Sequence, residues 1–347
     1  MTQFDIAALF IALVLSTGLL VAVVAAVWWF DRYDREPLQL VAGVFAWGAL
    51  AAPVLAVVCC SALGPGLGVS MSSLAGWLGP LVEEIAKALG IGLVILLSRE
   101  FDNPTDGVVY GTAAGLGFAA TENLVYTIVG AQATPIDGTL VVVLVRTALA
   151  AGIHAVSSAT LGGCLGFAYL SRRSLDRFAW GLAGLSGAVL IHGGWNVLLL
   201  RLGDASATTA PARWLIVVVA LYALYVVALA LFLRSEQRIL GTELSEEVEL
   251  DVVPAWVAEV IPYYRRRIRS EWWPSRRERT VLARLLTRLA FRKHAVRRLP
   301  KGEAELAGLE VMRLRQRVRV MLGVLDSCQT SVETTDPFVA SEPSDLP

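Results

Sequence analysis

The chain has 347 residues, of which 56% are hydrophobic and only 17% are charged, and its mean hydropathy is +0.61. Soluble domains have roughly 45–50% apolar and about 25% charged residues, so the composition excludes an ordinary soluble enzyme. Four cysteines and three histidines also exclude a disulfide scaffold and a zinc ribbon. The net charge is zero, yet 19 of 30 basic and 17 of 30 acidic residues lie in residues 235–347. This division predicts a membrane domain, residues 1–234, followed by a charged tail.

Apolar runs fill the predicted membrane domain. A bilayer core of ~30 Å takes about 20 helical residues, and seven runs are long enough: 7–30, 38–62, 74–97, 107–130, 139–170, 178–201 and 213–234. The fifth is too long for a simple crossing, so we expect it to tilt or to begin in the interface. The sequence thus predicts an all-α fold, a polytopic bundle of about seven transmembrane helices with a mostly helical tail.

The arginines between the apolar runs predict the orientation in the cell membrane. One set of loops and the start of the tail hold eight: Arg32, Arg35, Arg99, Arg172, Arg173, Arg177, Arg234 and Arg238. The opposite loops hold only Arg201 and Arg213. Because basic residues favour the cytosolic side, we expect the N-terminus outside and the tail, residues 235–347, in the cytosol.

The tail combines charge with helical periodicity. Residues 265–298 contain 13 Lys/Arg, and Leu282, Leu285, Leu286 and Leu289 recur there at helical spacing, which predicts a basic amphipathic helix. A second helix is expected over 303–325, and disorder over the last 20 or so residues. We expect a solvated appendage that contacts anionic lipid headgroups, and no nucleic-acid partner, because no recognition motif is present.

Ionisable residues inside the apolar runs are few. They are Glu83, Glu84, Lys87, Glu122, Arg146, His154 and His192, accompanied by Asn123 and Asn196. Each charged group at the centre of a span costs about 2.5–3.5 kcal/mol, so these side chains must face one another or a wet cavity. With 1.5 Å per residue, Glu84, Glu122, His154 and His192 all lie ~20–24 Å from the cytosolic ends of their helices. This common depth predicts one site in the outer half of the membrane.

Helical geometry adds detail to the third and fourth runs. Glu83 and Glu84 lie on either side of Lys87, one turn along, so the lysine can hold one carboxylate ionised while the other exchanges protons. Glycines at 107, 111, 115 and 117 permit a close helix contact or a cavity. The alternative interpretation is structural, with the Glu–Lys pair joining helices and each histidine satisfied by hydrogen bonds.

Five motifs follow one another in the membrane domain. They are an acidic-Glu-Pro element (Asp31, Asp34, Glu36, Pro37), EExxK (Glu83, Glu84, Lys87), FxxxEN (Phe118, Glu122, Asn123), His154 in HAVSS, and HxxxN (His192, Asn196). In this order they resemble the PrsW family of intramembrane proteases, within the superfamily of type II CAAX prenyl endopeptidases and bacteriocin-processing enzymes. The resemblance covers roughly residues 1–234 and excludes the tail. Glu122 departs from the wider superfamily, whose second motif usually carries histidine.

The resemblance implies peptide hydrolysis within or next to the membrane. It assigns catalytic roles to Glu83, Glu84, Glu122, His154, His192 and Asn196, and supporting roles to Lys87, Asn123 and Arg146. The glutamate pair and a histidine would activate water, and His192 and Asn196 would stabilise the oxyanion. Glu122 and His154 would orient the water or protonate the leaving amine. We favour a metal-free, glutamate-dependent mechanism; the alternative is a zinc ion on Glu84, His154 and His192.

The expected partners are the lipid bilayer and, as the resemblance implies, a membrane-protein or peptide substrate, such as a single-pass anti-sigma factor that undergoes a site-1-type cleavage. Two other functions compete with proteolysis. Intramembrane Glu, Lys and His also form proton relays, so a proton-coupled carrier is one alternative, although we find no repeated halves of the kind that carriers often show. The other is an enzymatically inert membrane scaffold whose tail recruits partners.

Overall fold

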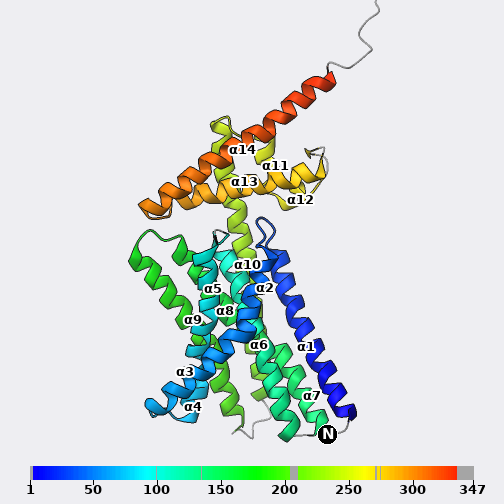
Figure 1. The fold of residues 1–347 in the computed structure, drawn as a ribbon, viewed down its shortest axis with the longest axis vertical. Coiled ribbons are helices and arrows are strands. Elements are labelled where there is room, and N and C mark those ends of the chain that lie inside the picture. The colour runs from blue at the N-terminus through cyan, green and yellow to red at the C-terminus, as the bar shows by residue number, and fades with distance from the viewer. Residues whose placement is uncertain are drawn as a thin grey trace, which may run out of the picture. The chain divides into compact units, whose positions relative to one another are not determined.

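The computed structural model describes residues 3–98, 100–133, 135–203, 210–269, 272–273 and 275–333 (Figure 1). These residues form helices and short connections, which confirms the predicted all-α fold. The elements are α1 (Gln3–Phe30), α2 (Leu38–Ala46), η1 (Trp47–Ala51), α3 (Ala52–Gly66), α4 (Met71–Ser73), η2 (Leu74–Leu78), α5 (Gly79–Leu97), α6 (Pro104–Ala133), α7 (Ile136–Val145), η3 (Arg146–Ala150), α8 (Ala151–Tyr169), α9 (Ser174–Gly203), α10 (Ala210–Glu249), α11 (Ala255–Val260), α12 (Tyr264–Arg267), α13 (Arg276–Val296) and α14 (Lys301–Glu333).

Five helical segments within the described residues are long and apolar enough to cross a membrane: Asp5–Phe30, Leu38–Gly66, Ile136–Tyr169, Ser174–Arg201 and Leu215–Glu249. The chain is therefore a multi-pass membrane protein. The other two predicted spans correspond to α5 and α6, where charged and small residues interrupt the apolar runs. A count of seven crossings stays a prediction, and so does the orientation of the termini.

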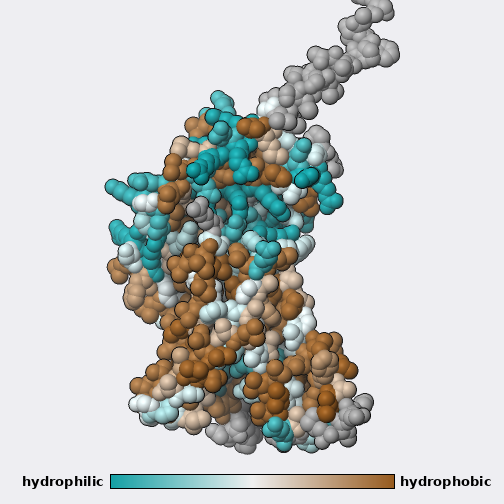
Figure 2. Space-filling model, in the orientation of Figure 1, coloured by the Kyte–Doolittle hydropathy of each residue, from teal (hydrophilic) through white to brown (hydrophobic). Residues whose placement is uncertain are grey.

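The chain divides into two compact units. Unit 1 comprises Met1–Glu236 with Arg298–Pro300, and unit 2 comprises Gln237–Arg297 with Lys301–Pro347. Figure 2 shows that the surface of unit 1 is mainly hydrophobic and that much of unit 2 is hydrophilic. Large apolar side chains such as Phe10, Leu50 and Leu96 are well exposed on unit 1. Exposed apolar surface of this extent is expected of helices that face lipid.

Helices α6 and α8 pack backbone against backbone at the centre of unit 1. A Cβ atom added at Gly111 would lie 2.3 Å from the carbonyl oxygen of Ser158, and one at Gly115 would lie 2.2 Å from that of His154. A Cβ atom added at Gly107, one turn before Gly111, would likewise collide with the backbone of α8. Only glycine permits this approach, which is the small-residue packing typical of membrane helices. The sequence allowed either a close helix contact or a cavity at these glycines, and the structure shows a close contact.

Three π-helical turns, η1, η2 and η3, interrupt the long helices of unit 1. A π-turn disturbs the regular i to i−4 ladder, so its carbonyl oxygens need other donors. The carbonyl of Ala49 in η1 accepts from the Thr121 hydroxyl, and that of Ala75 in η2 accepts from Asn196 Nδ2 at 3.0 Å. In η3 the carbonyl of Leu149 accepts from the Tyr222 hydroxyl at 2.7 Å. Side chains of neighbouring helices thus fix the three turns, and η2 and η3 lead directly into α5 and α8.

Unit 2 contains the two helices expected in the tail, α13 and α14. The predicted leucine face of α13 is buried, with Leu282, Leu286 and Leu289 fully inaccessible, and α13 packs along α14. The acidic end of α10 neutralises part of the basic surface, since Lys293 Nζ lies 2.9 Å from a carboxylate oxygen of Glu247. Disorder was predicted over the last 20 or so residues; α14 extends to Glu333, and residues 334–347 lie outside the described residues.

Candidate active site

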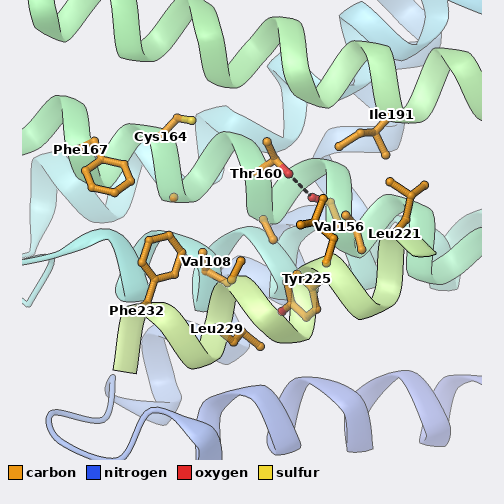
Figure 3. Close-up of a pocket in the computed structure, with 14 residues that line it drawn as sticks. Val108, Val156, Thr160, Cys164, Phe167, Ile191, Leu221, Tyr225, Leu229 and Phe232 are labelled. Carbon is orange, nitrogen blue, oxygen red and sulfur yellow. Dashed lines mark hydrogen bonds between the residues drawn. The ribbon is translucent and has the colours of Figure 1, made fainter. Parts of the chain in front are cut away.

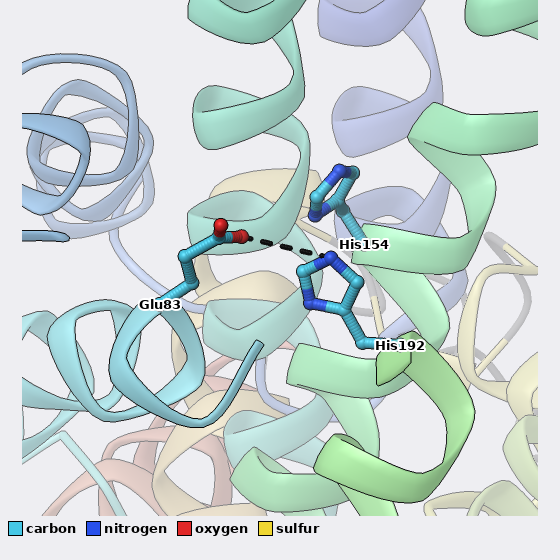
Figure 4. A group of neighbouring side chains, drawn as sticks. All are labelled: Glu83, His154 and His192. Carbon is cyan, nitrogen blue, oxygen red and sulfur yellow. Dashed lines mark ion pairs between the residues drawn. The ribbon is translucent and has the colours of Figure 1, made fainter. Parts of the chain in front are cut away.

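Four helices of unit 1 bring carboxylate, imidazole and ammonium groups together. Glu83, Glu84 and Lys87 come from α5, Glu122 from α6, His154 from α8 and His192 from α9. Figure 4 shows Glu83 with the two histidines, whose rings lie 4.5 Å apart between centroids. The four residues predicted to share one depth are therefore joined in one hydrogen-bonded cluster.

Glu84 lies at the closed side of this cluster and is fully buried. Its Oε1 accepts from Lys87 Nζ at 2.7 Å, from His192 Nδ1 at 2.9 Å and from the Ser157 hydroxyl at 3.1 Å. Its Oε2 accepts from the Ser158 hydroxyl at 2.8 Å. A carboxylate has about four acceptor sites, so four donors leave Glu84 saturated and held as an anion.

Lys87 determines the proton position on His154. Its Nζ lies 3.0 Å from His154 Nδ1 and 4.2 Å from the centre of the Phe118 ring. Because an ammonium can only donate, Nδ1 must be the acceptor, and the ring proton resides on Nε2. That nitrogen lies 2.6 Å from Glu122 Oε2, to which it donates. The imidazole is thereby fixed between a cation and an anion.

The hydrogen bonds of His192 leave its Nε2 as an acceptor that faces a second acceptor, Glu83 Oε2. Its Nδ1 donates to the saturated Glu84 carboxylate, so Nε2 carries the lone pair. Nε2 lies 3.6 Å from Glu83 Oε2, and this oxygen is buried and accepts no hydrogen bond within the described part of the chain. Two acceptors in this arrangement require a donor or a cation between them. These two atoms are therefore the candidate binding atoms for a water molecule or a metal ion.

Glu122 and Glu83 form the more open side of the cluster, with 26% and 19% of their side chains exposed, whereas Lys87 and Glu84 are inaccessible. Arg146 Nη2 donates to Glu122 Oε2 at 2.8 Å, and its guanidinium lies 3.7 Å from the centre of the Tyr126 ring. The cluster is therefore more accessible on the side of Glu122 and Glu83 than on the side of Glu84 and Lys87.

Two of the predicted residues lie next to the cluster rather than in it. Asn123 Oδ1 accepts from Arg146 Nε at 3.2 Å, and its Nδ2 donates to the hydroxyls of Ser16 and Thr147. Asn196 donates to the backbone of η2. Sequence reasoning did not single out Ser16, although a hydroxyl in the otherwise apolar first run was an available signal.

The ligand atoms of the cluster are of the types that bind metal ions in proteins. One ligand atom from each of Glu83, His154 and His192 lies within 4.8 Å of the others, and two histidines with one glutamate form a ligand set known from catalytic zinc. Three carboxylates against Lys87 and Arg146 also leave the cluster with one negative charge. The zinc set expected from the sequence contained Glu84. In the structure Glu84 is saturated, and Glu83 has the unused oxygen.

A separate apolar cavity of about 240 Å³ lies between α6, α8, α9 and α10 (Figure 3). Its wall includes Val156, Cys164, Phe167, Leu229 and Phe232. Its polar groups are satisfied internally, since the Thr160 hydroxyl donates to the Val156 carbonyl at 2.8 Å. None of the clustered carboxylates and histidines lines this cavity, so it is distinct from the candidate active site.

Carboxylates and imidazoles buried in a multi-pass helical bundle, with one more open side, are the groups that a membrane-embedded hydrolase or a proton relay uses. A family model described as PrsW family intramembrane metalloprotease matches residues 36–230, so the chain belongs to the PrsW family. It is 28% identical over 170 residues to Protease PrsW of Geobacillus kaustophilus, covering 49% of this chain and 71% of the relative. It is 29% identical over 180 residues to Protease PrsW of Bacillus subtilis, covering 50% and 76%. No solved structure matches.

Membership of this family decides among the functions that the sequence left open. The chain is an intramembrane peptidase, and the resemblance predicted from the five motifs is confirmed. The carrier and scaffold alternatives are set aside.

Proposed function

We propose that the chain hydrolyses a peptide bond of a membrane-protein substrate in the gap between Glu83 Oε2 and His192 Nε2. The observation that carries this proposal is the buried Glu83 oxygen, which accepts no hydrogen bond from the described residues and faces an imidazole lone pair at 3.6 Å. A water molecule placed there can donate to both groups. Glu83 then has the position of a general base.

Glu83 removes a proton from this water as its oxygen attacks the substrate carbonyl, and then delivers the proton to the leaving amine. His192 orients the water through Nε2. Glu122, held by the His154 Nε2–H, lies on the open side, where its carboxylate can hold the substrate amide in position. The oxyanion donor that we propose is Asn196 Nδ2, which also donates to the Ala75 carbonyl. His192, the other donor expected from the sequence, has no N–H left for this role, because its Nδ1 donates to Glu84 and its Nε2 accepts from the water.

The two glutamates thus receive different roles. Glu84, with its four donors, fixes the tautomer and the orientation of His192, in the way that a carboxylate orients a catalytic imidazole. Lys87 does the same for His154. Arg146 holds Glu122 and keeps it ionised beside the open face.

If a metal ion is the resident cofactor, Glu83, His154 and His192 are the residues that would hold it. A bound zinc ion supplies Lewis-acid activation of water and polarises the substrate carbonyl. His154 uses both ring nitrogens in hydrogen bonds, so it would exchange one of them for the ion. Glu84 would still orient His192, and Lys87 would still neutralise Glu84.

The substrate class that we propose is a single-pass membrane protein of the anti-sigma-factor kind. What supports this is the predicted position of the cluster in the outer half of the membrane, where a site-1-type cut would fall. The N-terminus outside, a membrane domain of residues 1–234 and a cytosolic tail of residues 235–347 belong to the same proposal and follow from the arginine distribution.

Cleavage of candidate single-pass substrates by the full chain in proteoliposomes tests the site. We expect Glu83→Gln to lower kcat by about 10³-fold or more, as loss of a general base does, while the exposed control Asp176→Asn keeps wild-type turnover. Undiminished cleavage by Glu83→Gln would contradict the proposed base. Titration of the same preparation with a chelator and then with zinc distinguishes the two forms of the mechanism.

A further inference from the structure

A further polar group lies beside the catalytic cluster, where side chains of α1, α6 and η3 meet. Ser16 belongs to α1 and Asn123 to α6, while Arg146 and Thr147 are consecutive residues of η3. Ser16 and Asn123 are buried. The family model matches residues 36–230 and therefore does not include α1. Ser16 is thus a contribution from a helix outside the matched region.

The hydrogens of this group can be assigned from its contacts. The Thr147 hydroxyl donates to the Val143 carbonyl at 2.7 Å, so towards other groups its oxygen can only accept. Ser16 Oγ lies 2.7 Å from Thr147 Oγ1 and is therefore the donor of that bond. Asn123 Nδ2 donates to Ser16 Oγ at 3.1 Å and to Thr147 Oγ1 at 3.2 Å. Both hydrogens of the amide nitrogen are thereby used.

This assignment fixes which way the Asn123 amide points. With Nδ2 held by the two hydroxyl oxygens, Oδ1 faces Arg146 and accepts from its Nε at 3.2 Å. A flipped amide would instead direct an NH₂ group at the guanidinium, which can only donate. Arg146 Nη2 donates in turn to Glu122 Oε2 at 2.8 Å, and the same oxygen accepts from His154 Nε2 at 2.6 Å. An unbroken series of hydrogen bonds therefore joins α1 to the active site.

We propose that Ser16 and Thr147 are positioning residues for the peptidase reaction. They orient the Asn123 amide, which holds the Arg146 guanidinium and so determines where the Glu122 carboxylate lies. An arginine side chain has many rotamers, and a single bond to Glu122 does not define its place, whereas a second bond from the Asn123 oxygen does. The inference rests on the proposed function, in which Glu122 holds the substrate amide on the open side.

Cleavage by the full chain in proteoliposomes measures the effect on the reaction. Thr147→Val keeps the size of the side chain but removes the hydroxyl, and it should lower kcat/KM by about tenfold. Thr147→Ser keeps the hydroxyl and should restore wild-type turnover. The matched control is Thr160→Val, which loses the same kind of bond to the carbonyl four residues earlier, here that of Val156 at 2.8 Å. This control should cleave as the wild type does.

A second variant keeps the test decisive if Thr147→Val does not fold. Ser16→Ala removes one of the two oxygens that hold the Asn123 nitrogen, with little change in size, and should lower kcat/KM by about threefold. Both effects act through the Asn123 amide. In an Asn123→Ala background, Ser16→Ala should therefore change kcat/KM by less than about twofold, because residues in one network are not additive.

The proton of the His154–Glu122 bond gives a readout that does not depend on cleavage. The chain has three histidines, His154, His192 and His294, so a ¹⁵N-histidine NMR spectrum of the full chain in detergent can be assigned with single variants. We expect the Nε2–H resonance of His154 to shift in Thr147→Val and in Ser16→Ala. It should return in Thr147→Ser and stay at the wild-type position in Thr160→Val.

The two measurements separate this inference from the function on which it rests. Wild-type kcat/KM and an unmoved His154 resonance in Ser16→Ala and Thr147→Val would overturn the positioning role; a lower thermal midpoint alone would then mean that these bonds only join helices. A shifted resonance in a chain that cleaves no single-pass substrate would support the positioning of Glu122 and contradict the proposed function.

Discussion

The close contact between α6 and α8 makes Gly115 the position where the smallest change should have a large effect. In Gly115→Ala the added methyl group would lie 2.2 Å from the carbonyl oxygen of His154 and 2.7 Å from its carbonyl carbon. Ordinary van der Waals contact begins near 3.4 Å, so α8 must move away by about 1 Å. Overpacking of this kind typically costs about 1–3 kcal/mol.

The displaced residue is His154 itself, so activity should fall more than stability. A misplacement of about 1 Å in a catalytic group can reduce turnover by about 100-fold. We therefore expect Gly115→Ala to lower kcat by about two orders of magnitude with a modest fall in the thermal midpoint and little change in KM. Cleavage kinetics in proteoliposomes and thermal unfolding in detergent measure the two effects on one preparation.

The matched control is Gly92→Ala on α5, where no atom lies within 4 Å of the added methyl group. This variant should keep full activity and should gain slightly in stability, because alanine is the better helix former. Wild-type kcat and an unchanged midpoint in Gly115→Ala would refute the assignment of α6 and α8 as a glycine-dependent contact.

Three further predictions follow from other contacts. Lys87→Met should abolish cleavage, because the Glu84 anion and His154 lose the cation between them. Activity of the variant above about a tenth of the wild-type value in a cleavage assay would contradict this. Asn196→Ala removes the donor to the η2 carbonyl and should lower the free energy of unfolding by about 0.5–1.5 kcal/mol, which thermal unfolding will measure. Burial first, and then Asp106, raises the pKa of Glu36 to about 12. The folded state therefore keeps a proton that the Glu36 carboxyl of the unfolded chain releases near pH 4.3. The free energy of unfolding should consequently fall as the pH rises above 4.3, by at most about 1.4 kcal/mol per pH unit. In the presence of a chelator, the free energy of unfolding of Glu36→Gln should depend less steeply on pH between 6 and 9 than that of the wild type. Equal slopes would contradict the prediction.

The meeting of the four helices at one level was predictable from the sequence, because depth follows from helical rise and from the ends of the apolar runs. Glu84, Glu122, His154 and His192 are in fact connected by hydrogen bonds. The π-turns were not predictable. They depend on donors such as Thr121 and Tyr222 on other helices, and no local sequence pattern links these hydroxyls to the carbonyls that they satisfy.

The difference between Glu83 and Glu84 also lay beyond sequence reasoning. Both are one turn from Lys87 on α5, and helical spacing alone permits either pair. The hydroxyls of Ser157 and Ser158 on α8 distinguish the two, because they donate to Glu84 and stabilise it as the anion that pairs with Lys87. Adjacent helical residues point about 100° apart, so a donor-rich wall for one glutamate leaves its neighbour facing the open side without donors.

This asymmetry links the fold to the chemistry. A buried base must accept a proton during the reaction, and a carboxylate already stabilised by four donors has little tendency to do so. Glu83, with its unused oxygen, retains that capacity, while Glu84 keeps His192 in the one tautomer that directs a lone pair toward Glu83. One helix, α8, carries both features, since the backbone of Ser158 packs against Gly111 of α6 and the Ser158 hydroxyl donates to Glu84 of α5.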